Sequence, residues 1–178
     1  MEIQGGSEAP ETREDAVLAF CGQERCILEK NGRLRLCRGW IDDFLRRCSG
    51  EVVMHGLPEG ALALYPEEVY REMRARELGD LDAVGSSFAA RRSLRRFGAL
   101  TRTDRLTPQG RVMIPEPFRE YAGLTAGAEV CVVGVEIGLE IWSPERFAAE
   151  MAAADAAMRR RAEAEFAAPP LSSCEKNL

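Results

Sequence analysis

The chain has 178 residues and a mass of 19.7 kDa, enough for one domain of ordinary size or two small ones. Hydrophobic residues make up 46% of the sequence and charged residues 30%, which excludes a disordered or fibrous protein. The formal net charge is −5, whereas a nucleic-acid-binding domain usually has a basic surplus, so the bulk charge argues against a nucleic-acid partner. The sequence has no membrane-length apolar segment, and its opening MEIQGGSEAPETRED does not resemble a signal peptide, so we expect a cytoplasmic protein.

The thiol and imidazole side chains give no pattern that is typical of an enzyme. None of the cysteine spacings is CxxC, so reduced thiols are expected rather than a zinc site, with Cys37 serving mainly in packing. The only histidine, His55, lies in the apolar run EVVMHGL, which favours a structural role. A Gly-rich phosphate loop and a Ser-His-Asp order are both absent from the sequence, so we expect neither catalysis nor a cofactor.

The most informative feature is an internal repeat. When the chain is shifted against itself by 78 positions, residues 28–73 fall on residues 106–151 without a gap. Gly32-Arg33 then matches Gly110-Arg111, and the apolar pattern carries over as well, with Leu64 on Trp142. The chain therefore contains two copies of one structural unit.

Each copy predicts the same succession of elements. A short strand comes first, at 25–30 and 103–108, and a tight turn follows in which Gly32 or Gly110 supplies a positive φ. The remaining elements are a second strand (33–36, 111–114), a short helix (40–48, 116–122), two Val-rich strands (51–57 and 61–65, 129–135 and 138–142) and a helix opened by Pro66 or Pro144. In the second copy, Pro115 begins the short helix and Gly123 ends it, and Ser143 is the expected N-cap of the last helix.

Two further helical segments flank the copies. Residues 78–98 predict a connecting helix with Ser86 or Ser87 as its cap. Its basic cluster, for which we favour a solvated or inter-subunit face over DNA contact, consists of Arg91, Arg92, Arg95 and Arg96. The closing helix extends to about residue 167, and its apolar stripe of Phe147, Met151 and Met158 indicates packing rather than a ligand site.

A single copy is too short to bury its own apolar sheet face, so the two copies should pack on each other. We expect a mixed α+β fold in which intertwined hairpins form one pseudo-twofold domain. The expected divisions are a tail at 1–19, a first half at 20–75, a connecting helix at 76–98, a second half at 99–148, a C-terminal helix at 149–168 and a tail at 169–178.

Four segments of this sequence resemble the MraZ family. They are LEKNGRL (28–34), GALALYPEE (60–68), QGRVMIPEPFREYAGL (109–124) and EVCVVGVEIGLEIWSPERF (129–147). The resemblance implies two tandem swapped-hairpin halves of the SpoVT/AbrB type. It also implies a nucleoid-associated bacterial transcriptional regulator, a repressor, which binds short direct repeats upstream of division and cell-wall genes and assembles into rings.

The family's marker is an Asp-x-x-x-Arg element in each half. Both arginines are present as Arg33 and Arg111, whereas the acidic positions hold Glu29 and Thr107. By this resemblance the structural motif of the protein consists of Glu29, Gly32, Gly110, Pro115 and Arg119.

An arginine-bearing β-hairpin can enter the major groove of double-stranded DNA, where the arginine fork matches guanine O6 and N7. The candidate DNA-binding residues are Lys30, Arg33, Arg35 and Arg38 in the first half and Arg102, Arg105 and Arg111 in the second. Arg33 either contacts a base or locks its own hairpin through Glu29. Arg111 stands opposite Thr107, so its acidic partner would be Glu120 or another carboxylate.

The basic side chains are concentrated in residues 28–48 and 91–119, so an acidic chain can still bind DNA locally. We expect double-stranded DNA and further copies of the chain as partners, and neither a membrane nor a small-molecule substrate. The alternative is an oligomeric scaffold or an antitoxin-like interaction protein in which DNA binding is weakened or lost.

Overall fold

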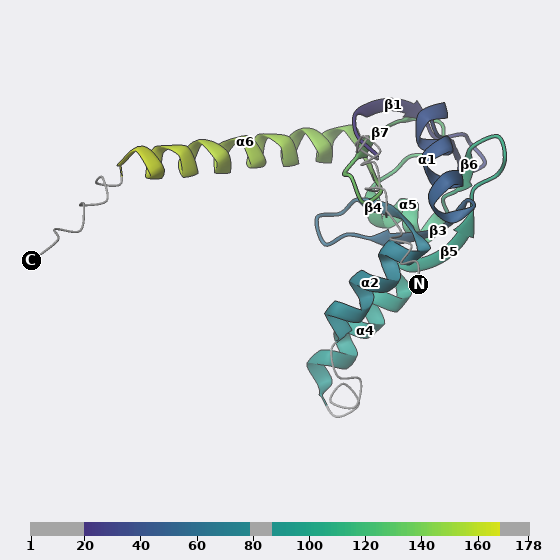
Figure 1. The fold of residues 1–178 in the computed structure, drawn as a ribbon, viewed down its shortest axis with the longest axis horizontal. Helices are drawn as coiled ribbons and strands as arrows, with labels where there is room; N and C mark the ends of the chain where they lie inside the picture. The colour runs from purple at the N-terminus through teal and green to yellow at the C-terminus, as the bar shows by residue number, and fades with distance from the viewer. Residues whose placement is uncertain (1–19, 79–86, 168–178) are drawn as a thin grey trace, which may run out of the picture.

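The computed structural model describes residues 20–78 and 87–167 (Figure 1). The tails expected at 1–19 and 169–178, and Ser86, lie outside the described residues. The first half contains β1 (Gln23–Ile27), β2 (Arg33–Arg35), α1 (Arg38–Cys48), β3 (Glu51–Gly56), β4 (Leu62–Pro66) and α2 (Glu67–Leu78). The rest contains α4 (Phe88–Ala99), β5 (Thr101–Arg105), β6 (Arg111–Met113), α5 (Glu116–Ala122), β7 (Glu129–Gly134), β8 (Leu139–Trp142) and α6 (Pro144–Ala167). None of the described helices is long and apolar enough to cross a membrane.

The two copies are intertwined through their strands, as predicted for a mixed α+β fold. The main sheet is antiparallel, with the strand order β1-β7-β8-β4-β3-β5, and β2 pairs with β6 in a separate two-stranded sheet. Each opening strand thus pairs with the other copy: β1 with β7, and β5 with β3. A pseudo-twofold axis passes between β4 and β8 and between β2 and β6, because both pairs join equivalent strands.

The principal core lies between the main sheet and a layer made of the β2–β6 pair, α1 and α5. Leu34 and Val112 face each other across β2 and β6, and both side chains are buried in this core. Phe44 of α1 and Phe118 of α5 fill the space beside them. Since residues of both copies alternate throughout this cluster, neither copy has a separate core.

The opposite face of the main sheet is covered by α2, α4 and the first turn of α6. Tyr70 of α2 and Phe97 of α4 stack with ring centroids 5.9 Å apart over Val53 and Tyr65. His55 is buried beside them, 2.9 Å from the Thr101 hydroxyl through Nδ1, which is the structural role expected for it.

The closing helix α6 leaves the body after its first turns and extends away from it (Figure 1). Phe147 packs on Trp142, with ring centroids 6.2 Å apart. Further along, Met151 is 47% and Met158 70% exposed, so within this chain the predicted packing stripe holds for Phe147 only.

Helix ends follow the local signals in most places. Pro115 and Gly123 flank α5, and Gly123 has a φ of 66°. The hydroxyls of Ser87 and Ser143 accept hydrogen bonds from the backbone N–H groups of Ala90 and Arg146, as N-caps do. Pro66 is an exception, because it is the last residue of β4 and α2 begins at Glu67.

The repeat is not free of gaps in the structure. With Gly56 and Gly134 equivalent, the strand registers pair Gly56 with Leu62 but Gly134 with Leu139. The β3–β4 connection is therefore one residue longer than the β7–β8 connection. Leu64 corresponds to Ile141 rather than to Trp142, and this shift keeps both on the side of the principal core. The gap-free alignment of the sequence does not contain this one-residue shift, because it matches Gly60 with Gly138, two glycines that do not hold equivalent places in the two connections.

The two hairpin turns depend on glycine for conformation and for space. Gly32 has a φ of 83° and Gly110 a φ of 73°. A Cβ at Gly110 would collide with Ile41 of α1, and a Cβ at Gly32 with Arg119 of α5. Ile41 and Arg119 are 78 positions apart, so the helix of each copy covers the hairpin turn of the other.

We predict that Gly110→Ala lowers the free energy of unfolding by about 2 kcal/mol or more, since it combines left-handed backbone strain with overpacking against Ile41. Thermal or urea unfolding followed by circular dichroism measures the change. Gly98→Ala in α4 is the matched control. Apart from its chain neighbours and the backbone of its own helix, no atom of the described residues lies within 4 Å of the added Cβ, so this variant should be neutral or stabilising. Equal stabilities of the two variants would contradict this role of Gly110.

Candidate nucleic-acid interface

The β2–β6 pair, called the ribbon below, presents arginines on one face. In its register Arg33 lies opposite Met113, and Arg35 lies opposite Arg111. Residues directly opposite each other in an antiparallel pair share a face, so Arg33, Arg35 and Arg111 point to the same side. Leu34 and Val112 point into the core beneath, which holds the ribbon against the body.

The two turns that lead into the ribbon are built in the same way. In the first, the Glu29 N–H donates to the Arg33 carbonyl at 2.8 Å, and the Gly32 N–H donates to the Glu29 carbonyl at 2.8 Å. In the second, the N–H groups of Thr107 and Gly110 donate to the carbonyls of Arg111 and Thr107, at 3.0 and 2.7 Å. The backbone therefore presents Arg33 and Arg111 in equivalent positions.

The charged contacts at the turns are not equivalent. Glu29 forms an ion pair with Arg111 of the other hairpin, at 3.2 Å. Locking of Arg33 by Glu29, one of the two roles considered above, is therefore wrong: the acid binds the arginine of the other copy. Among the described residues, no carboxylate lies at ion-pair distance from Arg33, whose guanidinium is left exposed. An ion pair between copies cannot be read from local spacing, because residues 29 and 111 meet only through the exchange of strands.

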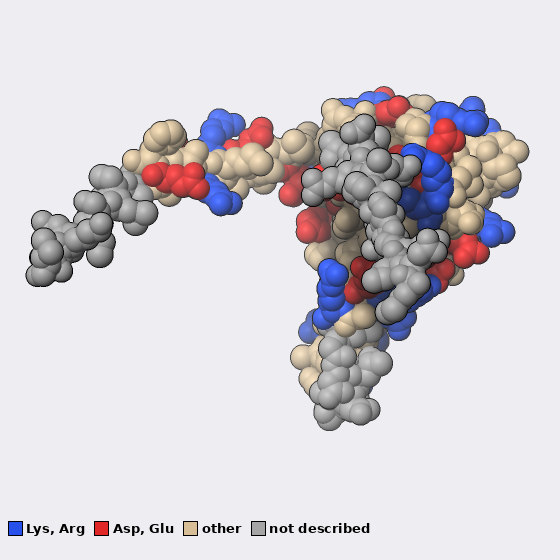
Figure 2. Space-filling model, in the orientation of Figure 1, with Lys and Arg blue, Asp and Glu red and all other residues tan. Residues whose placement is uncertain are grey.

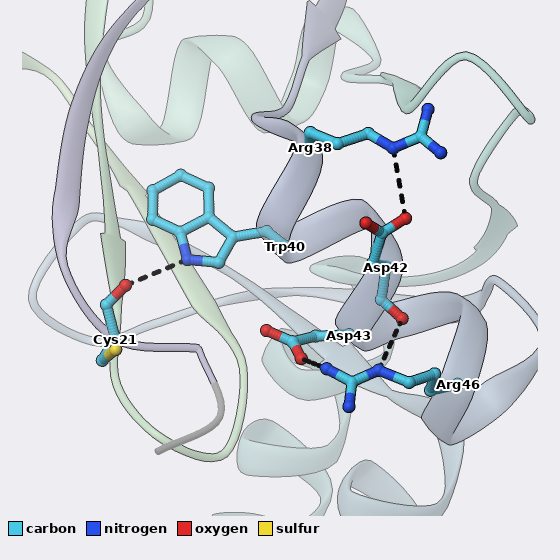
Figure 3. Close-up of polar contacts among 6 residues, drawn as sticks. All are labelled: Cys21, Arg38, Trp40, Asp42, Asp43 and Arg46. Atoms are coloured by element: carbon cyan, nitrogen blue, oxygen red, sulfur yellow. Dashed lines mark hydrogen bonds and ion pairs between the residues drawn. The ribbon is translucent and has the colours of Figure 1, made fainter. Parts of the chain in front are cut away.

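The remaining basic residues of the first half flank the ribbon. Lys30 is exposed in the turn itself. Arg38 is the first residue of α1 and pairs with Asp42 at 3.3 Å, yet its side chain remains 85% exposed (Figure 3). The Trp40 indole N–H donates to the Cys21 carbonyl at 3.1 Å and fastens this end of α1 to the chain before β1. Figure 2 shows basic side chains gathered over the region of α1, with acidic ones between them.

Arg102 and Arg105 do not join the ribbon. Both lie on β5, the edge strand of the main sheet, and their separation of three residues puts them on opposite faces of it. Arg105 pairs with Glu51 of β3 at 3.2 Å, and Arg102 lies 3.8 Å from Asp104. The structure therefore brings Arg111 to the ribbon face but leaves these two arginines at the sheet edge.

The basic cluster lies on α4, which packs through Phe97 on the face of the main sheet opposite the ribbon. Arg96 donates to the Tyr121 hydroxyl and lies over its ring, 5.7 Å from the centroid. Arg92 and Arg95 are exposed to solvent. Exposure does not distinguish a solvated or inter-subunit face from DNA contact, so the interpretation of this cluster stays a prediction.

Two half-buried cysteines, Cys26 and Cys37, are poorly suited to redox chemistry. Burial, with a contribution from Glu24, raises the pKa of the Cys26 thiol to about 11. Burial also raises the pKa of Cys37, which packs against the principal core. Because the thiolate is the reactive form, both positions suit packing rather than redox chemistry.

Comparison with known proteins identifies the family. Residues 104–167 match the family model described as "MraZ protein, putative antitoxin-like". The chain is 31% identical to "Transcriptional regulator MraZ" of Thermus thermophilus over 129 residues, which are 71% of this chain and 83% of that protein. The chain belongs to the MraZ family. Its match to the MraZ protein of Nocardioides sp. is 35% identical over 137 residues, 77% of this chain and 89% of the relative.

Membership of the MraZ family confirms the resemblance seen in the four sequence segments. A further relative of this name, from Herpetosiphon aurantiacus, is 32% identical over 129 residues, covering 72% of this chain and 83% of that protein. These relatives are named as transcriptional regulators and not as enzymes. The mixed α+β fold with paired halves agrees with the expectation drawn from the family.

The ion pair between Glu29 and Arg111 should be measurable as a coupling energy. Both side chains are more than a third exposed, so a double-mutant cycle of Glu29→Ala and Arg111→Ala should give about 0.2–1 kcal/mol in unfolding free energy. The matched cycle of Glu29→Ala with Arg33→Ala should give a coupling near zero. A larger coupling of Glu29 to Arg33 than to Arg111 would show that the pair forms within one hairpin.

Proposed function

We propose that this protein is a DNA-binding transcriptional regulator that contacts double-stranded DNA through its ribbon. The observation that carries the proposal is the exposure of Arg33 and Arg35 on the outer face of a two-stranded sheet, where Arg35 lies opposite the half-buried Arg111. The names of the relatives, each called a transcriptional regulator, support it.

The ribbon suits the major groove in shape and in chemistry. A two-stranded β-ribbon fits that groove, and an arginine fork can donate two hydrogen bonds to guanine O6 and N7. The underside of the ribbon is held by buried Leu34 and Val112, so little ordering of the backbone is needed on binding. Lys30 and Arg38 flank the ribbon and are placed to meet phosphates, which would set its position on the duplex.

Binding by one subunit should be weak, because the chain carries a net charge of −5 and few cations face the DNA. We propose that several subunits act together on short direct repeats upstream of division and cell-wall genes, as a ring-like homo-oligomer that represses them. Linked sites gain avidity that no single site has. The exposed apolar residues on α6 support self-association, since Met158 is 70% and Phe166 91% exposed.

A second candidate is an antitoxin-like interaction protein. It rests on the same protruding α6, which offers apolar side chains to a partner protein, and on the description of the matching family model. DNA binding separates the two functions, because the interaction protein does not need the ribbon arginines.

Arg33→Ala should lower the affinity for the DNA upstream of the protein's own gene by about tenfold, since one base or phosphate contact is lost. Fluorescence anisotropy at graded salt concentrations measures the affinity. Arg92→Ala removes the same charge from an exposed position on α4, outside the ribbon, and should change the affinity much less. Equal affinities of the wild type and Arg33→Ala would contradict readout by the ribbon.

The proposed oligomer predicts a mass in solution that is a multiple of 19.7 kDa, measured by light scattering. It also predicts that DNA affinity falls steeply when the spacing between tandem repeats is altered, because the subunits can no longer bind together. A monomer mass, or one repeat binding as tightly as three, would exclude the avidity mechanism.

A further inference from the structure

The two halves of the interface differ sharply in charge although their backbones are equivalent. The first half places cations at each of the positions that border or form the ribbon face: Lys30, Arg33, Arg35 and Arg38. The residues 78 positions further on are Pro108, Arg111, Met113 and Glu116. Around the pseudo-twofold axis, the positive charge therefore lies almost entirely on one side.

The ion pair at the turns increases this difference. Glu29 neutralises Arg111, the one cation that the second half contributes to the ribbon face. By the pseudo-twofold symmetry, the position next to Arg33 that corresponds to Glu29 next to Arg111 is Thr107. Threonine is uncharged and cannot form an ion pair. Arg33 therefore keeps its full charge toward solvent, whereas the charge of Arg111 is compensated.

The ends of the two short helices differ in the same sense. Arg38 is the first residue of α1, where the helix dipole disfavours a cation, and its ion pair with Asp42 still leaves 85% of its side chain exposed. Glu116 holds the equivalent position in α5, where the dipole favours an anion. Beside the ribbon, the first half therefore presents an exposed cation where the second half presents an exposed anion.

We propose that the DNA-contacting surface of each subunit is one-sided, with Arg33 and Arg35 as the residues that bind DNA and Arg111 as a positioning residue held by Glu29. The inference rests on the proposed function and deepens it. It follows that each subunit binds the duplex in one direction. A ribbon with equal charges on both sides of its axis would suit a palindromic element, whereas this ribbon requires an element without internal symmetry.

The test compares two arginines that the backbone presents equivalently. Arg33→Gln, Arg111→Gln and Glu29→Gln are measured by fluorescence anisotropy against a duplex from the region upstream of the protein's own gene, from low to high salt. The melting temperature of each variant confirms that it is folded. The dependence of affinity on salt reports the number of phosphates neutralised, which a merely structural role would not change.

Arg33→Gln should weaken binding by about tenfold. It should also reduce the magnitude of the negative slope of log affinity against log salt by about 0.9. Arg111→Gln should leave the slope unchanged. Glu29→Gln removes a negative charge and releases Arg111, so it should make the salt dependence steeper. Equal losses in Arg33→Gln and Arg111→Gln would overturn the one-sided interface while leaving DNA binding in place.

The direction of binding has its own measurement. The element protected in a footprint is placed twice in one duplex, either in tandem or with the second copy inverted at the same centre-to-centre spacing. Different affinities for the two duplexes are expected from a one-directional subunit, and equal affinities would overturn it. A wild type that binds no DNA would overturn the proposed function together with this inference.

Discussion

The exchange of strands between the two copies is the constraint on which the rest of the structure depends. β2 pairs with β6, and each opening strand completes the sheet of the other copy. This pairing creates the shared core and brings the two hairpin turns to the same face. It also places Ile41 and Arg119 over the glycines of the opposite turns. A conformational change in one copy must therefore alter the packing of the other, because the two copies share one hydrophobic core.

The same exchange explains how an acidic protein can offer a basic surface. The net charge of −5 is an average, and strand pairing gathers Arg33, Arg35 and Arg111 on one small face. Elsewhere many arginines are compensated by nearby carboxylates, as Arg105 is by Glu51 and Arg71 by Glu67. The available positive charge is thus limited in amount and defined in position, which favours specific over general attraction to DNA.

The backbone of the ribbon is nearly symmetric, and its side chains are not. Symmetry of the backbone follows from the repeat, since equivalent glycines and apolar residues build equivalent turns. Side chains on the exposed face carry little of the folding energy, so the two copies can diverge there without loss of stability. Arg35 and Met113, or Arg38 and Glu116, differ in this way. The fold thus provides two equivalent backbone positions, and the side chains around them differ in charge.

Much of the architecture was determined by the sequence alone. Glycine spacing, alternating apolar residues and the proline and glycine around α5 give the element order, because these signals act over a few residues. Three features were decided by the tertiary structure: the extra residue in the β3–β4 connection, the separation of Arg102 and Arg105 from the ribbon, and the pairing of Glu29 with Arg111. Each depends on which strand lies beside which. Strand neighbours are chosen by burial of the whole shared core, and spacing along one segment does not contain that information.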